Sequence, residues 1–332
     1  MIESKSPVVC VDVMGGDKAP SVVIEGIHLA LTADDSVRIL AVGAADLVEA
    51  LSADQPRVEP VPTSEVISMD EHPAAAIRSK KNSSIVVGCR LVKEGRADAF
   101  FSAGSTGAAM AAATLTMGRI PGVIRPAIAA VIPTLASPVV LLDAGANADC
   151  KTEHLVQFAH MGSAYSRIVL GTKSPRIALL NIGEEKSKGS LLTQEAYTIM
   201  SESVPGFIGN VEGTEITLGT ADVVVTDGFT GNVALKLMEG LSASLMDQVL
   251  GVVRSSTLTR LGAMPMRSGF AALKEHLDPE TYGGLPLLGI DGVCIIGHGS
   301  SSAVAVQNAI AVAAGAVRGR LTASTQDALH AM

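Results

Sequence analysis

The chain has 332 residues with a formal net charge of -8, and 48% of them are apolar. This length and composition are typical of one large globular domain and exclude a disordered chain. The acidic balance, with an isoelectric point near 5.4, excludes broad nucleic-acid binding and favours a small-molecule or protein partner.

Short apolar runs alternate with segments of helical periodicity along the chain. In chain order, the predicted strands are 8–13, 37–42, 98–102, 127–132, 138–142, 176–182, 222–226 and 292–296. The predicted helices are 21–31, 84–94, 107–117, 152–166, 190–201, 231–254 and 301–317. Most of the strands are continuously apolar, so we expect helices to cover both of their faces. The order of elements predicts an α/β fold, a three-layer α/β/α sandwich with a largely parallel sheet.

The chain shows no sign of a second domain, a secretory signal or a membrane span. No proline- or serine-rich linker interrupts it, so we expect a single α/β domain over residues 1–332. The N-terminal stretch MIESKSPVV lacks a long apolar run, and no stretch approaches 18 uninterrupted apolar residues. The four cysteines lie at positions 10, 89, 150 and 294 without a CxxC spacing, which predicts neither zinc nor disulfides. We therefore expect a cytoplasmic protein.

Glycine-rich polar loops follow six of the predicted strands. They are 14–20 (MGGDKAP), 102–107 (SAGSTG), 143–147 (DAGAN), 183–189 (GEEKSKG), 227–232 (DGFTGN) and 297–302 (GHGSSS). Ligands of open α/β sheets bind at the carboxyl ends of the strands, so we expect these loops to meet at one sheet edge. Hydroxyl groups, glycine backbone and helix N-termini all favour an anion, and phosphate is the simplest candidate.

Other standard sites are missing from the sequence. It contains no GxxxxGK[ST] motif, no GxGxxG motif after a strand, and no HExxH or clustered His/Cys set. We therefore predict neither a metal nor an organic cofactor.

A serine hydrolase is an alternative interpretation of these loops. Ala103-Gly104-Ser105-Thr106-Gly107 is similar to a nucleophile elbow, and Ser105, Asp227 and His298 occur in the chain order of α/β-hydrolases. That interpretation leaves the 14–20 loop without a role. The other interpretation makes phosphate itself a substrate, activated by positioning and by electrostatic stabilisation.

Several long stretches together resemble the phosphate acyltransferase family of phospholipid synthesis (PlsX), over residues 8 to about 317. They are VDVMGGDKAP, SAGSTGAAMAAATLTMGRIPGVIRPA, LLDAGANADCKTEHLVQFAHMGSAYS, LLNIGEEKSKG, FIGNVEG, DVVVTDGFTGNVALK and YGGLPLLGIDGVCIIGHGSS. The resemblance implies a fold similar to isopropylmalate dehydrogenases and phosphotransacetylases, a homodimer, and no metal or organic cofactor. It also implies a reaction of acyl-acyl-carrier-protein with inorganic phosphate, which yields an acyl phosphate for a membrane glycerol-3-phosphate acyltransferase.

This reaction needs a site that holds phosphate and stabilises a tetrahedral oxyanion. The predicted phosphate-binding residues are Gly15, Gly16, Lys18, Ser105, Thr106, Asn147, Thr230, Asn232, Ser300 and Ser301. The predicted catalytic residues are Asp227 as the first general-base candidate, His298 as the second, Lys188 as a neutralising cation, and Asp12 as an orienting or proton-accepting acid. Each has a structural alternative: a helix-capping or loop acid, a loop histidine or a solvated lysine.

One position departs from the resemblance. Relatives commonly carry asparagine where this chain has Ser105, and asparagine cannot act as a nucleophile, which weakens the hydrolase interpretation. A non-catalytic phosphate-binding regulator is a third alternative, and it predicts phosphate binding without loss of thioester.

A segment near residues 240–282 is predicted to form a helical protrusion. Leu237, Leu241, Leu245, Val249 and Val253 form one helical stripe, and residues 251–274 contain four basic residues and no acid. We expect an anionic membrane surface to contact Leu258, Leu261, Met264 and Phe270. The alternatives are docking of an acidic carrier protein, a dimer interface and an ordinary packed hairpin.

Overall fold

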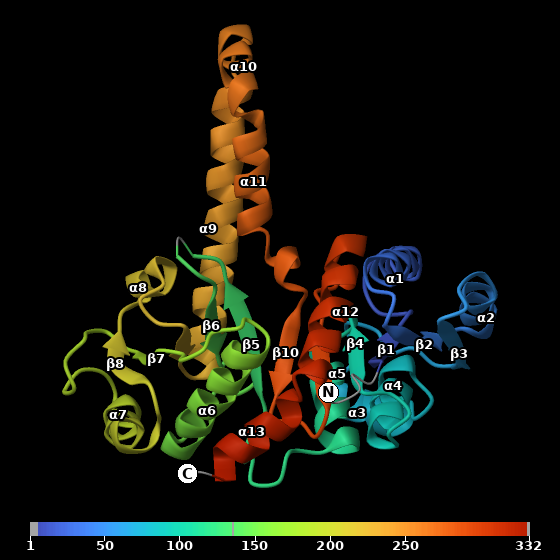
Figure 1. Cartoon of the computed structure of the whole chain (residues 1–332), viewed down its shortest axis with the longest axis horizontal. Coiled ribbons are helices and arrows are strands. Elements are labelled where there is room, and N and C mark those ends of the chain that lie inside the picture. The colour runs from blue at the N-terminus through green and yellow to red at the C-terminus, as the bar shows by residue number, and fades with distance from the viewer. Residues whose placement is uncertain (1–5, 135, 331–332) are drawn as a thin grey trace.

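The computed structural model describes residues 6–134 and 136–330, and they form a three-layer α/β/α fold around one mixed sheet (Figure 1). The strands are β1 (Val8–Asp12), β2 (Arg38–Gly43), β3 (Val58–Pro62), β4 (Ala99–Ser102), β5 (Ala127–Ile132), β6 (Val139–Leu142), β7 (Ile177–Leu180), β8 (Phe207–Val211), β9 (Val223–Val225), β10 (Leu285–Leu288) and β11 (Val293–Ile296). Their order in the sheet is β3-β2-β1-β4-β11-β10-β5-β6-β9-β7-β8.

Helices cover both faces of this sheet. They are α1 (Ser21–Ala33), α2 (Ala45–Asp54), α3 (Pro73–Ser79), α4 (Ser84–Lys93), α5 (Thr106–Ala112), α6 (Thr152–Ile168), α7 (Leu191–Ser203), α8 (Gly213–Leu218), α9 (Gly228–Arg254), α10 (Thr257–Ala263), α11 (Arg267–Leu277), α12 (Ala303–Arg318) and α13 (Leu321–His330). A π-helical turn η1 (Ala113–Met117) follows α5, and two 3-10 turns, η2 (Met264–Met266) and η3 (Pro279–Tyr282), flank α11.

Alternate residues of each central strand enter separate apolar cores. Val9 and Val11 of β1 pack into the core that contains α1, α6 and α12, whereas Cys10 packs into the core that contains α4 and α5. All three β1 side chains are fully buried. This double burial explains the continuous apolar runs of the sequence and confirms the predicted layers.

The sheet is largely parallel, as predicted, but its direction reverses in the middle. β11 pairs antiparallel with β10, β10 antiparallel with β5, and β5 antiparallel with β6. Three successive reversals leave β6, β7, β8 and β9 running opposite to β1, β2, β3, β4 and β11. The carboxyl ends of the two strand groups therefore leave the sheet at opposite edges, so the expectation of a single shared edge is wrong.

The helical protrusion is present. Helices α9, α10 and α11 extend away from the sheet in Figure 1, with α10 at the tip. Leu258 at this tip is 80% exposed and Met264 is 67% exposed. No helix among the described residues is long and apolar enough to cross a membrane.

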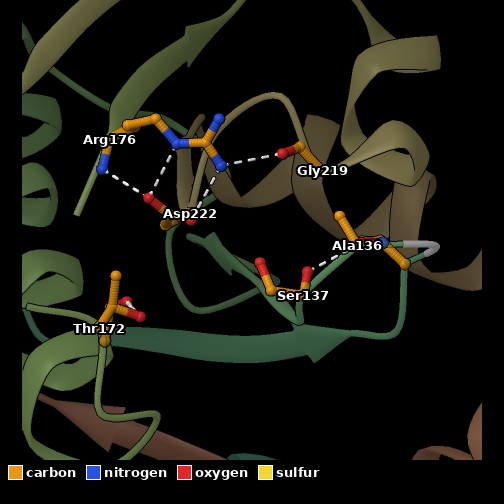
Figure 2. A network of polar contacts seen from close by, with 8 residues as sticks. Ala136, Ser137, Thr172, Arg176, Gly219 and Asp222 are labelled. Atoms are coloured by element: carbon orange, nitrogen blue, oxygen red, sulfur yellow. Dashed lines mark hydrogen bonds and ion pairs between the residues drawn. The ribbon is translucent and has the colours of Figure 1, made fainter. Parts of the chain in front are cut away.

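An ion pair fastens the start of β7 to the turn before β9 (Figure 2). The Arg176 guanidinium donates to Asp222 Oδ1 at 3.0 Å and Oδ2 at 3.1 Å, and also to the backbone carbonyl oxygen of Gly219. The Arg176 backbone N–H donates to Asp222 Oδ2 at 2.7 Å. Burial raises the pKa of Asp222, but the hydrogen bonds from Arg176 outweigh it and hold the pKa below its usual value.

We predict that Asp222→Asn lowers the free energy of unfolding by about 2 kcal/mol at pH 7, because it removes a charge-assisted bidentate pair. A lowered folded-state pKa contributes stability that is present above the unfolded pKa, about 3.9, and is lost as the pH falls through the folded value. Urea unfolding at several pH values should show the two proteins converging below about pH 4. The exposed acid substitution Asp35→Asn is the control, and a gap that persists at acid pH would contradict the ion-pair explanation.

Candidate active site

The predicted site residues fall into two groups, one at each edge of the sheet. The first group follows β1, β4 and β11 and contains Asp12, Gly15, Gly16, Lys18, Ser105, Thr106, His298, Ser300 and Ser301. The second follows β6, β7 and β9 and contains Asn147, Lys188, Asp227, Thr230 and Asn232. Within the described ranges, no hydrogen bond joins a residue of one group to a residue of the other.

Asp12 holds the loops of the first group together. Its carboxylate accepts hydrogen bonds from Ser102 Oγ at 2.7 Å and from the Met14 N–H at 3.0 Å, and Ser102 Oγ accepts from the Gly104 N–H. The side chain is only 1% exposed, and this burial raises the pKa of Asp12. Its carboxylate thus orients backbone and hydroxyl donors of two loops, one of the roles expected for it.

Close backbone packing explains the Gly15-Gly16 pair. A Cβ on Gly15 would lie 2.7 Å from the Gly104 nitrogen, and Gly16 has a φ of +109°. The neighbouring Asp17 N–H donates to the Gly299 carbonyl at 2.7 Å, which joins the 14–20 loop to the 297–302 loop. The small hollow between these loops holds about 10 Å³ and is lined by Gly15, Gly16, Lys18 and Ser301 among others. It has room for about one water molecule.

The hydrolase triad is not assembled. Ser105 caps α5 by accepting from the Ala108 N–H, and the His298 ring nitrogen Nδ1 lies 2.8 Å from Ser300 Oγ. Both carboxylate oxygens of Asp227 are bound to Thr230. Asp227 and His298 also follow strands that end at opposite edges, so this alternative is not supported.

Two residues of the second group, Asp227 and Thr230, line a cavity, whereas Asn147, Lys188 and Asn232 are not among its lining residues. This cavity holds about 290 Å³ and lies among the end of β7 and the first turns of α7 and α9. Its lining residues are Leu155, Leu179, Leu180, Asn181, Ile182, Gly189, Ser190, Leu192, Thr193, Thr226, Asp227 and Thr230. By comparison, the hollow beside Gly16 and the one beside β10 and β11 each hold about 10 Å³.

Two helix N-termini converge on this cavity, and each has a side-chain cap. Asp227 caps α9: its Oδ1 accepts from the Thr230 N–H at 2.9 Å and its Oδ2 accepts from Thr230 Oγ1 at 2.7 Å. Ser190 caps α7 by accepting from the Thr193 N–H. Helix N-termini carry partial positive charge and orphan N–H groups, so the mouth of the cavity favours an anion.

Lysines lie in the loop beside the cavity. Lys186 and Lys188 are exposed on the 183–189 loop, and the Lys186 ammonium lies 5.7 Å from the centre of the Tyr197 ring. The Asn181 side-chain amide donates to the Lys188 carbonyl and fastens this loop to β7. The loop therefore presents two exposed lysines, together with the exposed Glu184 and Glu185, next to two helix N-termini.

Asp143 and Asn147 shape the other side of the second group. The Asp143 carboxylate accepts from the N–H groups of Ile128, Gly145, Ala146 and Asn147, and burial raises its pKa. The Asn147 side-chain amide donates to Asp143 and to the Pro126 carbonyl, so both of its protons are used within the protein. Asn232 is exposed on α9.

Two contacts near the predicted loops involve residues that the sequence did not single out. Ser190 and Thr193 form a Ser-x-x-Thr cap after the 183–189 loop, a spacing that the sequence displays. Glu280 accepts from the Ser302 N–H at 2.9 Å and from Ser302 Oγ, which ties the base of the protrusion to α12. No local pattern indicates that contact, because 22 residues separate the partners.

The described cysteines are unpaired, and Cys150 Sγ donates to the Asn147 carbonyl oxygen at 3.6 Å. Cys10, Cys89 and Cys294 are buried and unpaired, and burial raises the pKa of the Cys294 thiol to about 12. Among residues 6–134 and 136–330, no group of three potential metal-ligating side chains comes together.

The fold is that of phosphotransacylases. The EutD phosphotransacetylase from Staphylococcus aureus superimposes with a TM-score of 0.62 at 18% identity and covers 95% of each chain. A phosphotransacetylase from Streptococcus pyogenes gives 0.63, also at 18% identity, over 94% of each chain. This confirms the expected phosphotransacetylase-like architecture.

The sequence comparisons are more specific. Residues 8–323 match the model of the fatty acid synthesis protein family. The phosphate acyltransferase of Heliobacterium modesticaldum is 48% identical over 324 residues, which cover 96% of each chain. That of Elusimicrobium minutum is 53% identical over 249 residues, covering 75% of this chain and 73% of the relative. The protein belongs to this family, the PlsX phosphate acyltransferases, and is an acyltransferase.

Proposed function

We propose that the protein transfers the acyl group of an acyl-acyl-carrier-protein to inorganic phosphate, in the cavity between α7 and α9. The observation that carries the proposal is this 290 Å³ cavity with two capped helix N-termini at its mouth, in a member of an acyltransferase family. It has room for phosphate and for part of a thioester, whereas the hollow beside Gly16 has room for about one water molecule.

The proposed chemistry is a single displacement through a tetrahedral intermediate. A phosphate oxygen attacks the thioester carbonyl, a new carbon–oxygen bond forms, and the carbon–sulfur bond breaks. The proton of hydrogen phosphate passes to the departing thiolate, so that the products are an acyl phosphate and the free carrier-protein thiol. The site must neutralise phosphate and stabilise the oxyanion. Helix N-termini provide fixed dipoles for this purpose, which need no rearrangement during the reaction.

Named residues have distinct roles in this proposal. The phosphate lies beside Ser190 at the first turns of α7 and α9, and Lys188 moves to neutralise it. Thr193 and Thr230 form the wall of this site, because their N–H and hydroxyl groups already donate to the helix caps. Asp227 accepts the proton of the attacking phosphate and passes it on to the departing thiolate, because its carboxylate lines the cavity and retains free lone pairs beside its two bonds to Thr230. The first group, in which Lys18 and Thr106 were predicted to bind phosphate and His298 to be the second general base, lies at the other edge of the sheet and has no role in this proposal.

Acyl transfer is tested by trapping acyl phosphate as a hydroxamate with neutral hydroxylamine, using palmitoyl-acyl-carrier-protein with and without phosphate. We expect product only with phosphate, and we expect Asp227→Asn to lower kcat at least ~100-fold without lowering the melting temperature. Asparagine is as good an N-cap as aspartate, so the variant separates proton transfer from helix capping.

The contrary outcomes are also informative. Thioester loss without phosphate would support the serine hydrolase interpretation. The absence of any thioester loss would indicate a phosphate-binding protein without catalytic activity. Full activity in Asp227→Asn would show that Asp227 caps α9 and does not act as the general base. Phosphate-dependent coenzyme A thioester turnover that exceeds carrier-protein turnover would contradict the proposed donor.

The protrusion is proposed to join the enzyme to a second copy and to an anionic membrane. Leu237, Leu241 and Leu245 of α9 are 67%, 55% and 52% exposed, which suits pairing of this stripe with its counterpart in a homodimer. Leu258, Leu261, Met264 and Phe270 lie in the tip region near Arg260 and Arg267. A membrane contact would place the acyl phosphate near a membrane glycerol-3-phosphate acyltransferase, its proposed consumer in phospholipid synthesis.

We predict that Leu258→Glu abolishes flotation with vesicles that contain anionic lipid, because it places a carboxylate at an 80% exposed apolar tip position. Leu218→Glu is the matched control, since Leu218 on α8 is 58% exposed and lies outside the protrusion. Flotation of Leu258→Glu to the same extent as the unchanged protein would refute the membrane contact at this tip.

A further inference from the structure

The lining of the 290 Å³ cavity is mainly polar at its mouth and mainly apolar at its inner end, with the buried Thr226 and the exposed Ile182 as the exceptions. Leu155 is 1% exposed and Leu179 is fully buried, so these two side chains lie at its inner end. Ser190 and Thr230 are exposed and cap or begin helices, so they lie at its mouth. A ligand that matches this lining has an anionic head and an apolar tail.

The reactants of the proposed function have this amphiphilic character. An acyl phosphate carries its charge on the phosphate and its apolar surface on the chain. A methylene group occupies about as much space as a water molecule, roughly 30 Å³, so the volume that phosphate and the thioester leave free holds fewer than about ten chain carbons. Burial of each methylene group strengthens binding about fourfold, so even part of a chain would bind appreciably.

We infer that the apolar inner end of this cavity binds the acyl chain and that Leu192 sets the longest chain accepted. The inference rests on the proposed function and assigns a chain-binding role to Leu155, Leu179 and Leu192. The chain enters tail first, and the head stays at the helix N-termini, where Asp227 and Thr230 contact the reacting groups.

Leu192 is the best placed of these residues to control length. It belongs to the first turn of α7, lines the cavity and is half-buried. Leu155 and Leu179 belong to the packed core, where a size change would disturb many neighbours. The adjacent Leu191 is 78% exposed and does not line the cavity, because consecutive helical residues point about 100° apart.

The test compares Leu192→Trp, Leu192→Ala and the matched control Leu191→Trp. Butyryl-, decanoyl- and palmitoyl-acyl-carrier-protein are assayed with phosphate by hydroxamate formation, and kcat/KM is measured for each. We expect Leu192→Trp to lower kcat/KM for palmitoyl and decanoyl donors at least ~10-fold and for the butyryl donor less than ~2-fold. Leu192→Ala should shift preference toward the palmitoyl donor, and Leu191→Trp should leave all three values unchanged.

The outcomes separate this inference from the proposed function. If the unchanged protein makes no hydroxamate from any donor with phosphate, the proposed function and the inference both fail. If the unchanged protein is active and Leu192→Trp lowers kcat/KM for all three donors by the same factor, the inference is overturned and the proposed function stands. If Leu192→Trp does not fold, as judged by its melting curve, an unchanged chain preference in Leu192→Ala overturns the inference by itself.

Discussion

The antiparallel insertion at the centre of the sheet is the constraint on which the rest of the structure depends. An odd number of antiparallel pairings separates β11 from β6, so the two parallel groups run in opposite directions. The glycine-rich polar loops therefore lie at two opposite edges of the sheet, where different residues surround them. At one edge, loops pack against each other through Asp12 and Ser102, and at the other edge they open around a cavity.

The open edge has the properties that acyl transfer to phosphate needs. Two helix N-termini contribute partial positive charge, one of them beside the Asp227 carboxylate, and the 183–189 loop adds two lysines together with two glutamates. In the proposed function, the apolar inner end takes the acyl chain out of water. The protrusion begins at this same site, because the first turn of α9 is the Asp227-capped turn, and returns to α12 through Glu280. The segment from α9 to η3 thus connects the second loop group, at Asp227, with the first loop group, at Ser302.

The sequence predicted much of the layered fold, and the reasons are physical. Continuous apolar runs such as Val8–Asp12 identify strands that are buried on both faces, and glycine-rich loops identify helix starts. The three strands it missed carry weak signals. β3 (VEPVP) and β10 (LPLL) contain proline, which is typical of a loop or an edge strand, and β8 (FIGNV) contains a glycine in its interior. Because β10 was missed, the reversal of direction was missed too, and with it the division of the predicted site. Local patterns specify that a loop suits an anion, but strand pairing decides which loops meet.

The most direct test of this account is to locate the bound anion. Crystals grown with tungstate, a phosphate analogue with a strong anomalous signal, would show its position without reference to activity. The account predicts the anion between the first turns of α7 and α9, within hydrogen-bond distance of Ser190. An anion bound only between the 14–20 and 297–302 loops, beside Gly16 and Ser301, would contradict it and place the chemistry at the other edge of the sheet.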